Sequence, residues 1–580
     1  MGGKKLNEHA IYHIIDTPYA YAKDANTLCI RIKTAKNDIS RCILHYKDRY
    51  DWVNSFKAKD MKVVLSTKLF DFYETEISVY RDRYRYYFEL IDNNGNRAFL
   101  DDRGLRNYDV DKKEITSFQY AYIAPDDVYK ESSWLQESVV YQIFVDRFYN
   151  GDKSNDPEGT LEWGSNVTST SMFGGDLKGI IQKLDYIKEL GVNLIYLTPI
   201  FKSSSNHKYN TADYYDIDSQ FGTIDDAKEL VSQCHKRKMR IVFDAVFNHS
   251  GSDFFAFQDL LKNQQNSKYK DWYLTDGYPV DTEKINYYTF AVGISDMPKF
   301  NTENKEVNDY LLKVAGYWIN EVGIDGWRLD VCDEVSHRFW QLFRKEIKSK
   351  NSNAVAIGEI MHEASSFLKG DQLDSIMNYP FKNAVIDFFA KRIIDADRFN
   401  DILNNSRTSY MDSICRQMWN LIGSHDTSRF LTECNDKVER MKLAIAFQFS
   451  YIGVPYIYYG DEVGINGGEE PLSRGCMIWD KDKQNHELLN LYKTMINIRK
   501  QNKELVYGSY NSLYAKDNVL VFERAYNGSK VIIAINNNYE ETDVSVPAKG
   551  KYKNLINNKI TKIDGDIKLS SMDFLILKVC

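Results

Sequence analysis

The pattern of hydrophobic and polar positions changes along the chain and first indicates an all-β region. Hydrophobic residues alternate with polar neighbours at positions 28, 30 and 32, and again at 84, 86, 88 and 90. Successive side chains of a strand point to opposite faces, so this period of two predicts half-buried strands. Asn94-Gly95 supplies the left-handed turn of a tight hairpin. We expect residues 1–125 to form an N-terminal β-sandwich.

From Trp134 the pattern alternates between strands and helices. Apolar residues recur at helical spacing from 177 to 187, and Thr223 and Asp226 have the spacing of a capping box at the start of a helix over 223–238. Short apolar runs predict buried strands at 138–148, 192–200, 239–247, 324–329, 354–360, 374–379, 417–424 and 455–460. Eight strands separated by helices predict a (β/α)8 TIM barrel over 126–503, with an open doubly wound sheet as the alternative.

Two further segments complete the expected multidomain organisation. The interval between His249 and Met297 is too long for an ordinary loop and carries its own aromatic residues, so we expect an inserted subdomain at about 250–301. From about residue 504 the pattern is β again, and Asn527-Gly528 predicts a hairpin. Residues 504–580 should form a C-terminal β-sandwich.

Composition and charge narrow the setting. The 580 residues carry 75 basic and 82 acidic side chains, a net charge of −7, and no basic run that would favour nucleic acid or an anionic membrane. No apolar run of about 18 residues occurs, so we expect no membrane span. The start of the chain has no uninterrupted apolar segment after Lys4 and Lys5, so we expect no signal peptide. The eight cysteines show no close pair and no Cys-x-x-Cys spacing, which favours a reducing cytoplasm.

The first candidate for chemistry lies at the end of the strand predicted at 324–329. Arg328 and Asp330 are two residues apart and should therefore face one site. A neighbouring guanidinium should keep the carboxylate ionised, which makes Asp330 a candidate nucleophile. A buried Arg–Asp pair can also be purely structural, and this stretch alone does not distinguish the two interpretations.

A TIM barrel places its reactive groups after the carboxyl ends of its strands. Three other predicted strands end in polar residues of the same kind: Asp244 and His249, then Glu359, then His425 and Asp426. Together with Arg328 and Asp330, these side chains predict one active site at the rim of the barrel.

Four of these segments, in chain order, resemble the four sequence regions of the alpha-amylase superfamily, glycoside hydrolase family 13: 244–249, 326–330, 358–360 and 424–426. The resemblance runs from about residue 134 to the end of the chain. Met297-Pro-Lys-Phe-Asn301 is similar to the fifth region of the branch that contains neopullulanase, cyclomaltodextrinase and maltogenic amylase. Members of that branch also carry an N-terminal sandwich.

The resemblance implies a retaining glycosidase, which needs a carboxylate nucleophile and a carboxylic acid about 5 to 5.5 Å apart. Asp330 would be the nucleophile, and Glu359, with its pKa raised by burial and neighbouring carboxylates, the general acid and then the base. Asp426 would bind substrate hydroxyls and help the ring distort. Asp244, His249, Arg328 and His425 would complete the substrate-binding set around the glucose that is cleaved.

Two more loops are similar to substrate-binding segments of the family. Tyr209 would stack on the cleaved sugar, with His207 as a second contact. Glu470 and Arg474 match a substrate-binding pair that normally begins with Asp, so the charge is retained one methylene further out. Met361 stands where close relatives usually have Trp beside the general acid, a departure expected to affect acceptor handling and the balance between transfer and hydrolysis.

A separate cluster predicts a structural Ca²⁺ site. One short turn holds two amides and two carboxylates, and a Gly-Gly-Asp segment can add a carbonyl and a further carboxylate; the candidate ligands are Asn150, Asp152, Asn155, Asp156, Gly174 and Asp176. Oxygen ligands on a glycine-bent turn suit calcium. The spacing also resembles the calcium site of the neopullulanase branch. No organic cofactor is expected.

The resemblance therefore implies a cytoplasmic hydrolase of α-1,4 links in maltooligosaccharides and cyclodextrins, with pullulan cleavage and transglycosylation as further expected activities. It also implies a homodimer formed through the N-terminal domain. One alternative is an α-1,6-glucosidase or branching enzyme of the same superfamily. Another is a non-catalytic glucan-binding protein, although the complete set of Asp330, Glu359 and Asp426 argues against lost catalysis.

Overall fold

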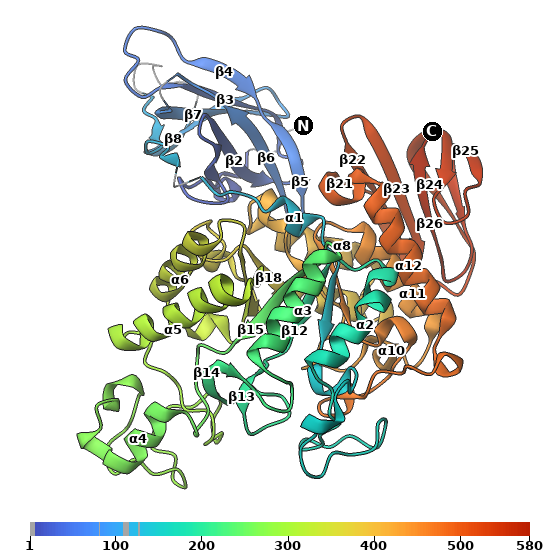
Figure 1. The fold of residues 1–580 in the computed structure, drawn as a ribbon. Coiled ribbons are helices and arrows are strands. Elements are labelled where there is room, and N and C mark those ends of the chain that lie inside the picture. The colour runs from blue at the N-terminus through green and yellow to red at the C-terminus, as the bar shows by residue number, and fades with distance from the viewer. Residues whose placement is uncertain (1–5, 81, 108–114, 126–127) are drawn as a thin grey trace. The chain divides into compact units, whose positions relative to one another are not determined.

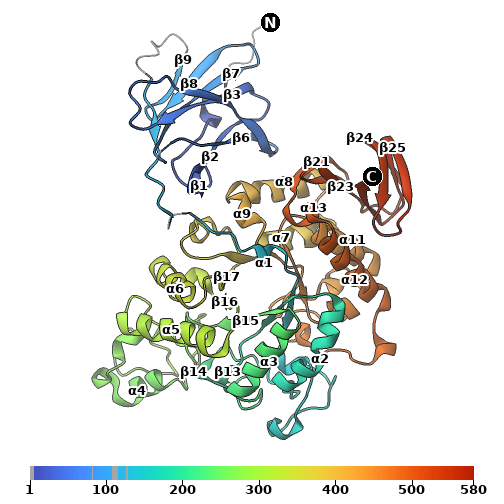
Figure 2. The same cartoon turned by 45° about the horizontal axis from the view of Figure 1, so that its top comes forward.

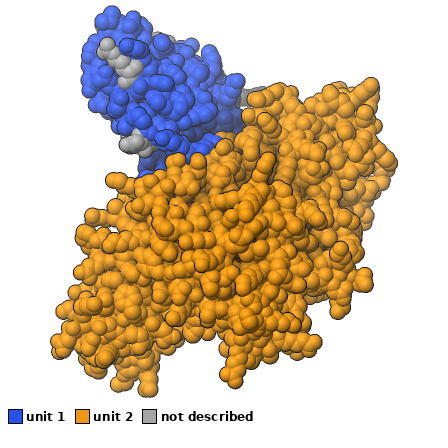
Figure 3. All heavy atoms as spheres, in the orientation of Figure 1, with its two compact units in different colours: residues 1–131, 365–371, 400–415 blue, residues 132–364, 372–399, 416–580 orange. Residues whose placement is uncertain are grey.

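The computed structural model describes residues 6–80, 82–107, 115–125 and 128–580 (Figure 1). The N-terminal lysines at 4 and 5 and the expected domain boundary at 126 lie outside these residues. The chain divides into two compact units, coloured separately in Figure 3. The first comprises residues 1–131, 365–371 and 400–415, and the second comprises residues 132–364, 372–399 and 416–580.

The first unit contains the expected sandwich of antiparallel strands. One sheet has the order β1-β2-β6-β5, formed by β1 (Ala20–Asp24), β2 (Thr27–Ala35), β6 (Phe70–Ile77) and β5 (Lys62–Ser66). The other has the order β4-β3-β7-β8-β9, with β10 beside β7; its strands are β4 (Lys57–Asp60), β3 (Ile39–Asp48), β7 (Tyr84–Asp92), β8 (Arg97–Asp101), β9 (Gly104–Asn107) and β10 (Phe118–Gln119). The alternating residues of β2 and β7 enter a single core, which confirms the period-two prediction.

Both predicted hairpin turns form. Gly95 lies between β7 and β8 with φ +83°, a left-handed conformation that glycine adopts without strain. Asn527 and Gly528 have φ +48° and +82° and join two strands of the C-terminal sheet, as a type I′ turn requires.

The second unit contains a closed barrel of eight parallel strands, which confirms the TIM barrel and excludes the open sheet. The strands, in chain and barrel order, are β11 (Val140–Ile143), β12 (Leu194–Leu197), β15 (Arg240–Ala245), β16 (Gly326–Leu329), β17 (Val355–Ile360), β18 (Ser375–Asn378), β19 (Trp419–Asn420) and β20 (Val454–Tyr458). Their side chains are buried throughout except at Arg240, as expected for parallel strands covered on both faces.

Several strands are shorter than the apolar runs that predicted them, and local hydrogen bonding explains two of these differences. After β11 the Asp146 carboxylate accepts hydrogen bonds from the backbone N–H groups of Phe173 and Gly174, and the chain turns into a 3-10 helix at 145–147. At the end of β19 the Gln448 side-chain amide donates to the Asn420 and Tyr456 carbonyls, so these two groups leave the ladder between β19 and β20.

Helices cover the outside of the barrel (Figure 1, Figure 2). The helices of the chain are α1 (Ser133–Gln136), α2 (Leu177–Leu190), α3 (Ile224–Lys236), α4 (Phe255–Asn263), α5 (Lys305–Tyr317), α6 (His337–Lys350), α7 (Tyr379–Val385), α8 (Ala396–Thr408), α9 (Asp412–Cys415), α10 (Phe430–Glu433), α11 (Val438–Ser450), α12 (His486–Gln501) and α13 (Lys503–Tyr507). Thr223 and Asp226 form the predicted capping box at the start of α3. The helix α5 continues as a π-helical turn (Trp318–Val322) and ends at Gly323, whose φ is +85°.

The segment expected as an inserted subdomain contains α4 and a set of packed aromatic rings. Phe257 packs on Tyr273 and Tyr287, and Tyr273 stacks on Phe300. A bridge between His249 and Lys299 ties the start of the segment to its end. The preceding loop, after β12, carries the short hairpin β13 (Phe201–Ser203) and β14 (Thr211–Ile217).

The C-terminal region is an antiparallel sheet of order β21-β22-β23-β26-β24-β25, with its own hydrophobic core. The strands are β21 (Ser509–Lys516), β22 (Val519–Tyr526), β23 (Ser529–Asn536), β24 (Thr542–Asn554), β25 (Ile560–Leu569) and β26 (Asp573–Val579). In the part of the chain that the structure describes, no helix has the length and apolar character needed to span a bilayer.

Candidate active site

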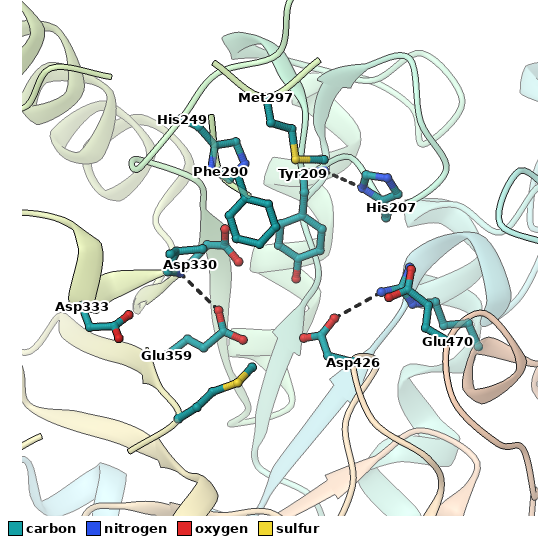
Figure 4. Close-up of a pocket in the computed structure, with 13 residues that line it drawn as sticks. His207, Tyr209, His249, Phe290, Met297, Asp330, Asp333, Glu359, Asp426 and Glu470 are labelled. Carbon is teal, nitrogen blue, oxygen red and sulfur yellow. Dashed lines mark hydrogen bonds and ion pairs between the residues drawn. The ribbon is translucent and has the colours of Figure 1, made fainter. Parts of the chain in front are cut away.

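A pocket of about 480 Å³ opens at the carboxyl ends of the barrel strands. Its walls come from the loops after β12, β15, β16, β17, β19 and β20, which is the rim that the barrel prediction selected. Figure 4 shows the lining side chains: His207, Tyr209, His249, Phe290, Met297, Asp330, Val331, Asp333, Glu359, Met361, Asp426, Glu470 and Arg474.

Arg328 joins the two carboxylates proposed for bond cleavage. Its Nη1 lies 2.9 Å from Asp330 Oδ1, and its Nη2 lies 2.5 Å from Glu359 Oε1. Arg328 is fully buried and Nη1 also contacts Asp244 Oδ2 at 3.0 Å. Because Asp330 and Glu359 contact the same guanidinium, they lie close enough to act on one glycosidic bond.

The electrostatics of this cluster differ from the simple Arg–Asp pair expected from the sequence. Burial, followed by the charge of Glu359, raises the pKa of Asp330 well above its usual value, and Arg328 opposes this effect. Burial also raises the pKa of Glu359, and raises that of Asp244 to about 6. Three buried carboxylates thus share one positive charge, so the cluster tends to bind one proton. The charge of Arg328 is therefore not sufficient by itself to keep Asp330 ionised.

A strained residue lies between the nucleophile candidate and the rest of its loop. Val331 has φ +43°, a left-handed conformation that is unusual for a β-branched residue. In this conformation its backbone N–H donates to Glu359 Oε2 at 3.2 Å. The Tyr379 hydroxyl donates to Glu359 Oε1 at 3.4 Å from the other side.

In the view of Figure 4, Asp426 lies on the same side of the pocket as Glu359, and it contacts a different cation. Arg474 Nη2 donates to Asp426 Oδ1 at 3.2 Å, and Arg474 Nη1 lies 2.6 Å from Glu470 Oε1. His425 Nε2 lies 3.1 Å from Asp426 Oδ2. The structure therefore brings Glu470 and Arg474 together at the rim, next to the third carboxylate.

Tyr209 is held between two buried side chains. Its hydroxyl lies 2.5 Å from His425 Nε2 and donates to Asp244 Oδ2 at 3.1 Å, and its ring stacks on His425 with centroids 5.5 Å apart. On the far side, Gln142 Nε2 lies 2.6 Å from His425 Nδ1. Asp244, Arg328 and His425 lie behind the pocket surface and act on it through their contacts with lining residues.

Burial keeps the histidines of the site neutral. It lowers the pKa of His207 to about 4, that of His249 to about 3 and that of His425 well below its ordinary value. His249 Nε2 is buried and finds no hydrogen-bond partner among the described residues, so it is available to a ligand in the pocket. Neutral imidazoles can accept and donate hydrogen bonds to sugar hydroxyls without changing the charge of the pocket.

Sequence reasoning missed several residues of the pocket and its support. Phe290, Met297 and Asp333 line the pocket but were not among the predicted site residues. Phe290 packs beside His249 with ring centroids 5.1 Å apart, and no strand-end rule selects it, because the inserted subdomain places it there. Gln142 and Tyr196, whose hydroxyl donates to Asp244 Oδ2 at 2.6 Å, lie in β11 and β12 and could have been found by applying the strand-end rule to those strands.

The predicted calcium ligands lie together in the loop after β11 and at the start of α2. Asn150 Oδ1 and Asn155 Oδ1 are buried without a hydrogen-bond partner in the described ranges, and amide oxygens of this kind fit a calcium ion as ligands. A Cβ at Gly174 would lie 2.2 Å from Asp156 Oδ1, so only glycine fits beside that carboxylate.

The carboxylates of this cluster are partly engaged elsewhere. Asp176 caps α2 by accepting from Gly179 N at 2.6 Å. Asp152 is the poorest fit, because Lys178 Nζ lies 2.6 Å from its Oδ2. Across the described residues, no three His, Cys, Asp or Glu side chains form a metal-binding group, so a calcium site here would depend on amide and carbonyl oxygens.

Comparison with known proteins shows the same three-part organisation. Three family models match the chain: the catalytic domain of alpha amylase over residues 142–485, its N-terminal Ig-like domain over 6–124 and its C-terminal domain over 508–570. A cyclomaltodextrinase of Thermoanaerobacter pseudethanolicus is 48% identical over 97% of this chain and 98% of its own length. Neopullulanase 2 of Thermoactinomyces vulgaris is 42% identical over 93% of each chain.

A solved structure of a cyclomaltodextrinase superposes with a TM-score of 0.93 at 40% identity, covering 98% of this chain and 99% of that one. The catalytic-domain match alone spans more than half of the chain and includes the pocket. With its closed barrel and its carboxylate cluster at the strand ends, the chain belongs to the alpha-amylase family, glycoside hydrolase family 13.

Proposed function

We propose that the protein is a retaining hydrolase of α-1,4-glucosidic bonds in maltooligosaccharides and cyclodextrins, with pullulan as a further substrate. The observation that carries this proposal is the contact of Asp330 and Glu359 with one buried guanidinium. Relatives named cyclomaltodextrinase and neopullulanase, similar over nearly the whole chain, support the substrate class.

In the first step the Glu359 carboxylic acid gives its proton to the glycosidic oxygen while an Asp330 oxygen attacks the anomeric carbon. The C–O bond to the leaving sugar breaks, and a glycosyl ester on Asp330 forms. Burial raises the pKa of Glu359, which favours the protonated form that this step needs. In the second step Glu359, now a carboxylate, takes a proton from water as the water oxygen attacks the same carbon and releases Asp330.

The other polar residues of the pocket hold the sugar. Asp426, tied to Arg474, accepts hydrogen bonds from substrate hydroxyls, and the Tyr209 ring provides a stacking surface. His249 Nε2 and His207 supply further hydrogen bonds from the opposite wall (Figure 4).

The activity is tested by release of reducing ends from maltotriose and β-cyclodextrin. Glu359→Gln keeps the shape of the side chain but removes the proton, so turnover should fall by about 10² to 10⁴. Glu363→Gln, an exposed carboxylate four residues later, is the control and should leave turnover unchanged. Binding of maltotriose without turnover by the wild type would favour a non-catalytic glucan-binding protein instead.

Product analysis on pullulan distinguishes the bond that is cut. Panose as product means cleavage of α-1,4 links, as proposed, whereas maltotriose would mean an α-1,6-glucosidase.

We also propose that the enzyme transfers glycosyl groups to sugar acceptors. Met361, 53% exposed beside Glu359, borders the space where an acceptor would enter. Products longer than the substrate at high maltotriose concentration would support transfer.

We propose that Ca²⁺ binds at the loop after β11, held by Asn150, Asn155, Asp156 and the Gly174 carbonyl, with Asp152 and Asp176 as the remaining predicted ligands. The unpartnered amide oxygens of Asn150 and Asn155 support this site. When bound, the cation would brace the loop and take no chemical part. Added Ca²⁺ should raise the unfolding temperature of chelator-treated protein, and Asn150→Ala with Asn155→Ala should abolish that rise.

We propose that the protein is a homodimer formed through its N-terminal domain. That domain exposes an apolar loop between β3 and β4 in which Trp52 is 74% exposed and Val53 is 93% exposed. The Arg85 guanidinium lies over the Trp52 ring, 4.7 Å from its centroid. Exposed patches of this kind are typical of interaction surfaces. Light scattering should give the mass of a dimer for the wild type and a smaller mass for Trp52→Ser; a monomeric wild type would contradict the proposal.

We propose that the protein is cytoplasmic. The eight cysteines form no disulfide in the structure, and seven of them are buried, which fits a compartment where thiols stay reduced. Fractionation of producing cells should recover the activity with cytoplasmic marker enzymes.

A further inference from the structure

Lys208 lies between two pocket residues, His207 and Tyr209, yet its own side chain is completely buried. Its Nζ lies 3.0 Å from Asp218 Oδ2 and donates to the Ser203 carbonyl at 3.2 Å. A buried ammonium is costly unless it is paired and hydrogen-bonded, and both conditions hold here.

Hydrogen bonds from the backbone hold the carboxylate of Asp218 in place. Asp218 Oδ2 accepts from Ser203 N at 2.9 Å, and Asp218 Oδ1 accepts from Gln220 N at 3.1 Å. Asp218 N in turn donates to the Ile200 carbonyl at 3.0 Å, just after the second barrel strand. The Lys208 ammonium therefore contacts both strands' ends: Ser203 is the last residue of β13, and Asp218 directly follows β14.

The backbone of Lys208 is left-handed, with φ +64°. A non-glycine residue pays a conformational cost for this geometry and keeps it only where other contacts hold it. The buried ion pair is one such contact, and a hydrogen bond from Lys208 N to Ser205 Oγ at 2.9 Å is another. Because of this turn, the side chain of Lys208 enters the interior while its neighbours His207 and Tyr209 line the pocket.

The position of Tyr209 depends closely on this turn. Its hydroxyl reaches both Asp244 and His425, and its ring lies parallel to the imidazole, with an angle of 5° between the planes. A small rotation at residue 208 would move the whole ring. We propose that Lys208 is a positioning residue: its buried ion pair with Asp218 locks a left-handed turn that places Tyr209 against the sugar to be cleaved. This inference rests on the proposed function and adds a residue that does not touch the substrate.

The experiment measures steady-state turnover of β-cyclodextrin by Lys208→Met, Lys208→Gly, Tyr209→Ala and the double variant Lys208→Met/Tyr209→Ala. Lys208→Met removes the tether and disfavours the turn, so kcat should fall by about 10- to 100-fold. Lys208→Gly also removes the tether but adopts positive φ freely, so it should retain more turnover than Lys208→Met. A merely structural role predicts no such order.

If Lys208 acts through Tyr209, the two substitutions are not independent. Lys208→Met should then lower kcat by less than about threefold when Tyr209 is already Ala, because no ring is left to position. Losses that multiply in the double variant, or a Lys208→Met enzyme with wild-type kcat, would overturn the proposal. If Lys208→Met does not fold, the same comparison is made with Lys208→Met/Asp218→Asn, which leaves no unpaired charge.

The matched control is Lys348→Met. Lys348, in α6, has its Nζ 3.1 Å from the buried Asp374, so this change removes a cation from a buried carboxylate away from the pocket, where Arg344 remains 2.8 Å from Asp374. It should lower the unfolding temperature without changing kcat. A wild type that turns over no α-glucan would refute the proposed function itself, whereas an active wild type with an equally active Lys208→Met would refute only the role of Lys208.

Discussion

The backbone N–H of Val331 donates a hydrogen bond to Glu359 Oε2 at 3.2 Å, so the loop that begins at Asp330 also holds the proposed acid. Val331 itself has a left-handed backbone, with φ +43°. A backbone donor next to the nucleophile thus helps to orient the second carboxylate.

This relationship predicts opposite results for two substitutions at residue 331. Val331→Gly keeps the N–H and tolerates positive φ, so kcat should stay within about tenfold of the wild type. Val331→Pro removes the donor and imposes a φ near −65°, so kcat should fall by about 100-fold or more. Hydrolysis of maltotriose by both purified variants checks this, and an active Val331→Pro enzyme would show that the bond is dispensable.

A second prediction concerns Arg328 and the pH dependence of activity. Arg328 lowers the pKa of Asp330, so its removal should raise that pKa further. In Arg328→Gln the nucleophile would then remain protonated up to a higher pH. The apparent pKa of the acidic limb in the pH profile of kcat/KM should rise by about one pH unit or more. The value of kcat/KM at neutral pH should also fall strongly.

Arg344→Gln is the control for this shift. Arg344 pairs with the buried Asp374 at 2.8 Å in another part of the barrel, so its loss should destabilise the fold without moving the limb. An unchanged limb in Arg328→Gln would contradict the assignment of the shared cation.

The buried histidines predict how stability depends on pH. Burial lowers the pKa of His249 from 6.5 to about 3, so between these values the unfolded chain binds a proton that the folded protein does not. Stability therefore rises with pH through this window and is lost as the pH falls below about 6.5. At pH 4.5 the cost should be about 2 to 3 kcal/mol for this one residue.

Urea unfolding at pH 7 and pH 4.5 measures this effect. His249→Gln has no imidazole to protonate when the chain unfolds. Between pH 7 and pH 4.5 its free energy of unfolding should therefore decrease less than that of the wild type, by about 2 to 3 kcal/mol. Equal losses in both proteins would mean that His249 is protonated in the folded state.

The barrel and its principal site residues could be predicted because they depend on local rules. Parallel strands all present their carboxyl ends at one rim, so Asp244, Asp330 and Glu359 could be grouped from strand ends alone. The rule does not give the depth of each side chain: Asp244 lies behind the pocket while Glu359 lines it. Depth depends on barrel curvature and on neighbours distant in sequence.

Features set by long-range packing were not predictable in this way. Phe290 reaches the pocket only because the inserted subdomain folds back, and Lys178 reaches Asp152 only because α2 begins beside the loop after β11. The length of β19 was overestimated because Gln448, in α11, binds the Asn420 and Tyr456 carbonyls. The burial of Lys208 ran against its charge, and Asp218 and the Ser203 carbonyl account for it.

The most direct test of the account is the configuration of the first product. Proton NMR of wild-type enzyme with maltooligosaccharide, recorded before mutarotation, distinguishes the α from the β anomer at the newly formed reducing end. Attack by Asp330 followed by attack of water inverts the anomeric carbon twice, so the α anomer should appear first. If the β anomer appears first, a single displacement occurs, and Asp330 and Glu359 do not act as nucleophile and acid on one bond.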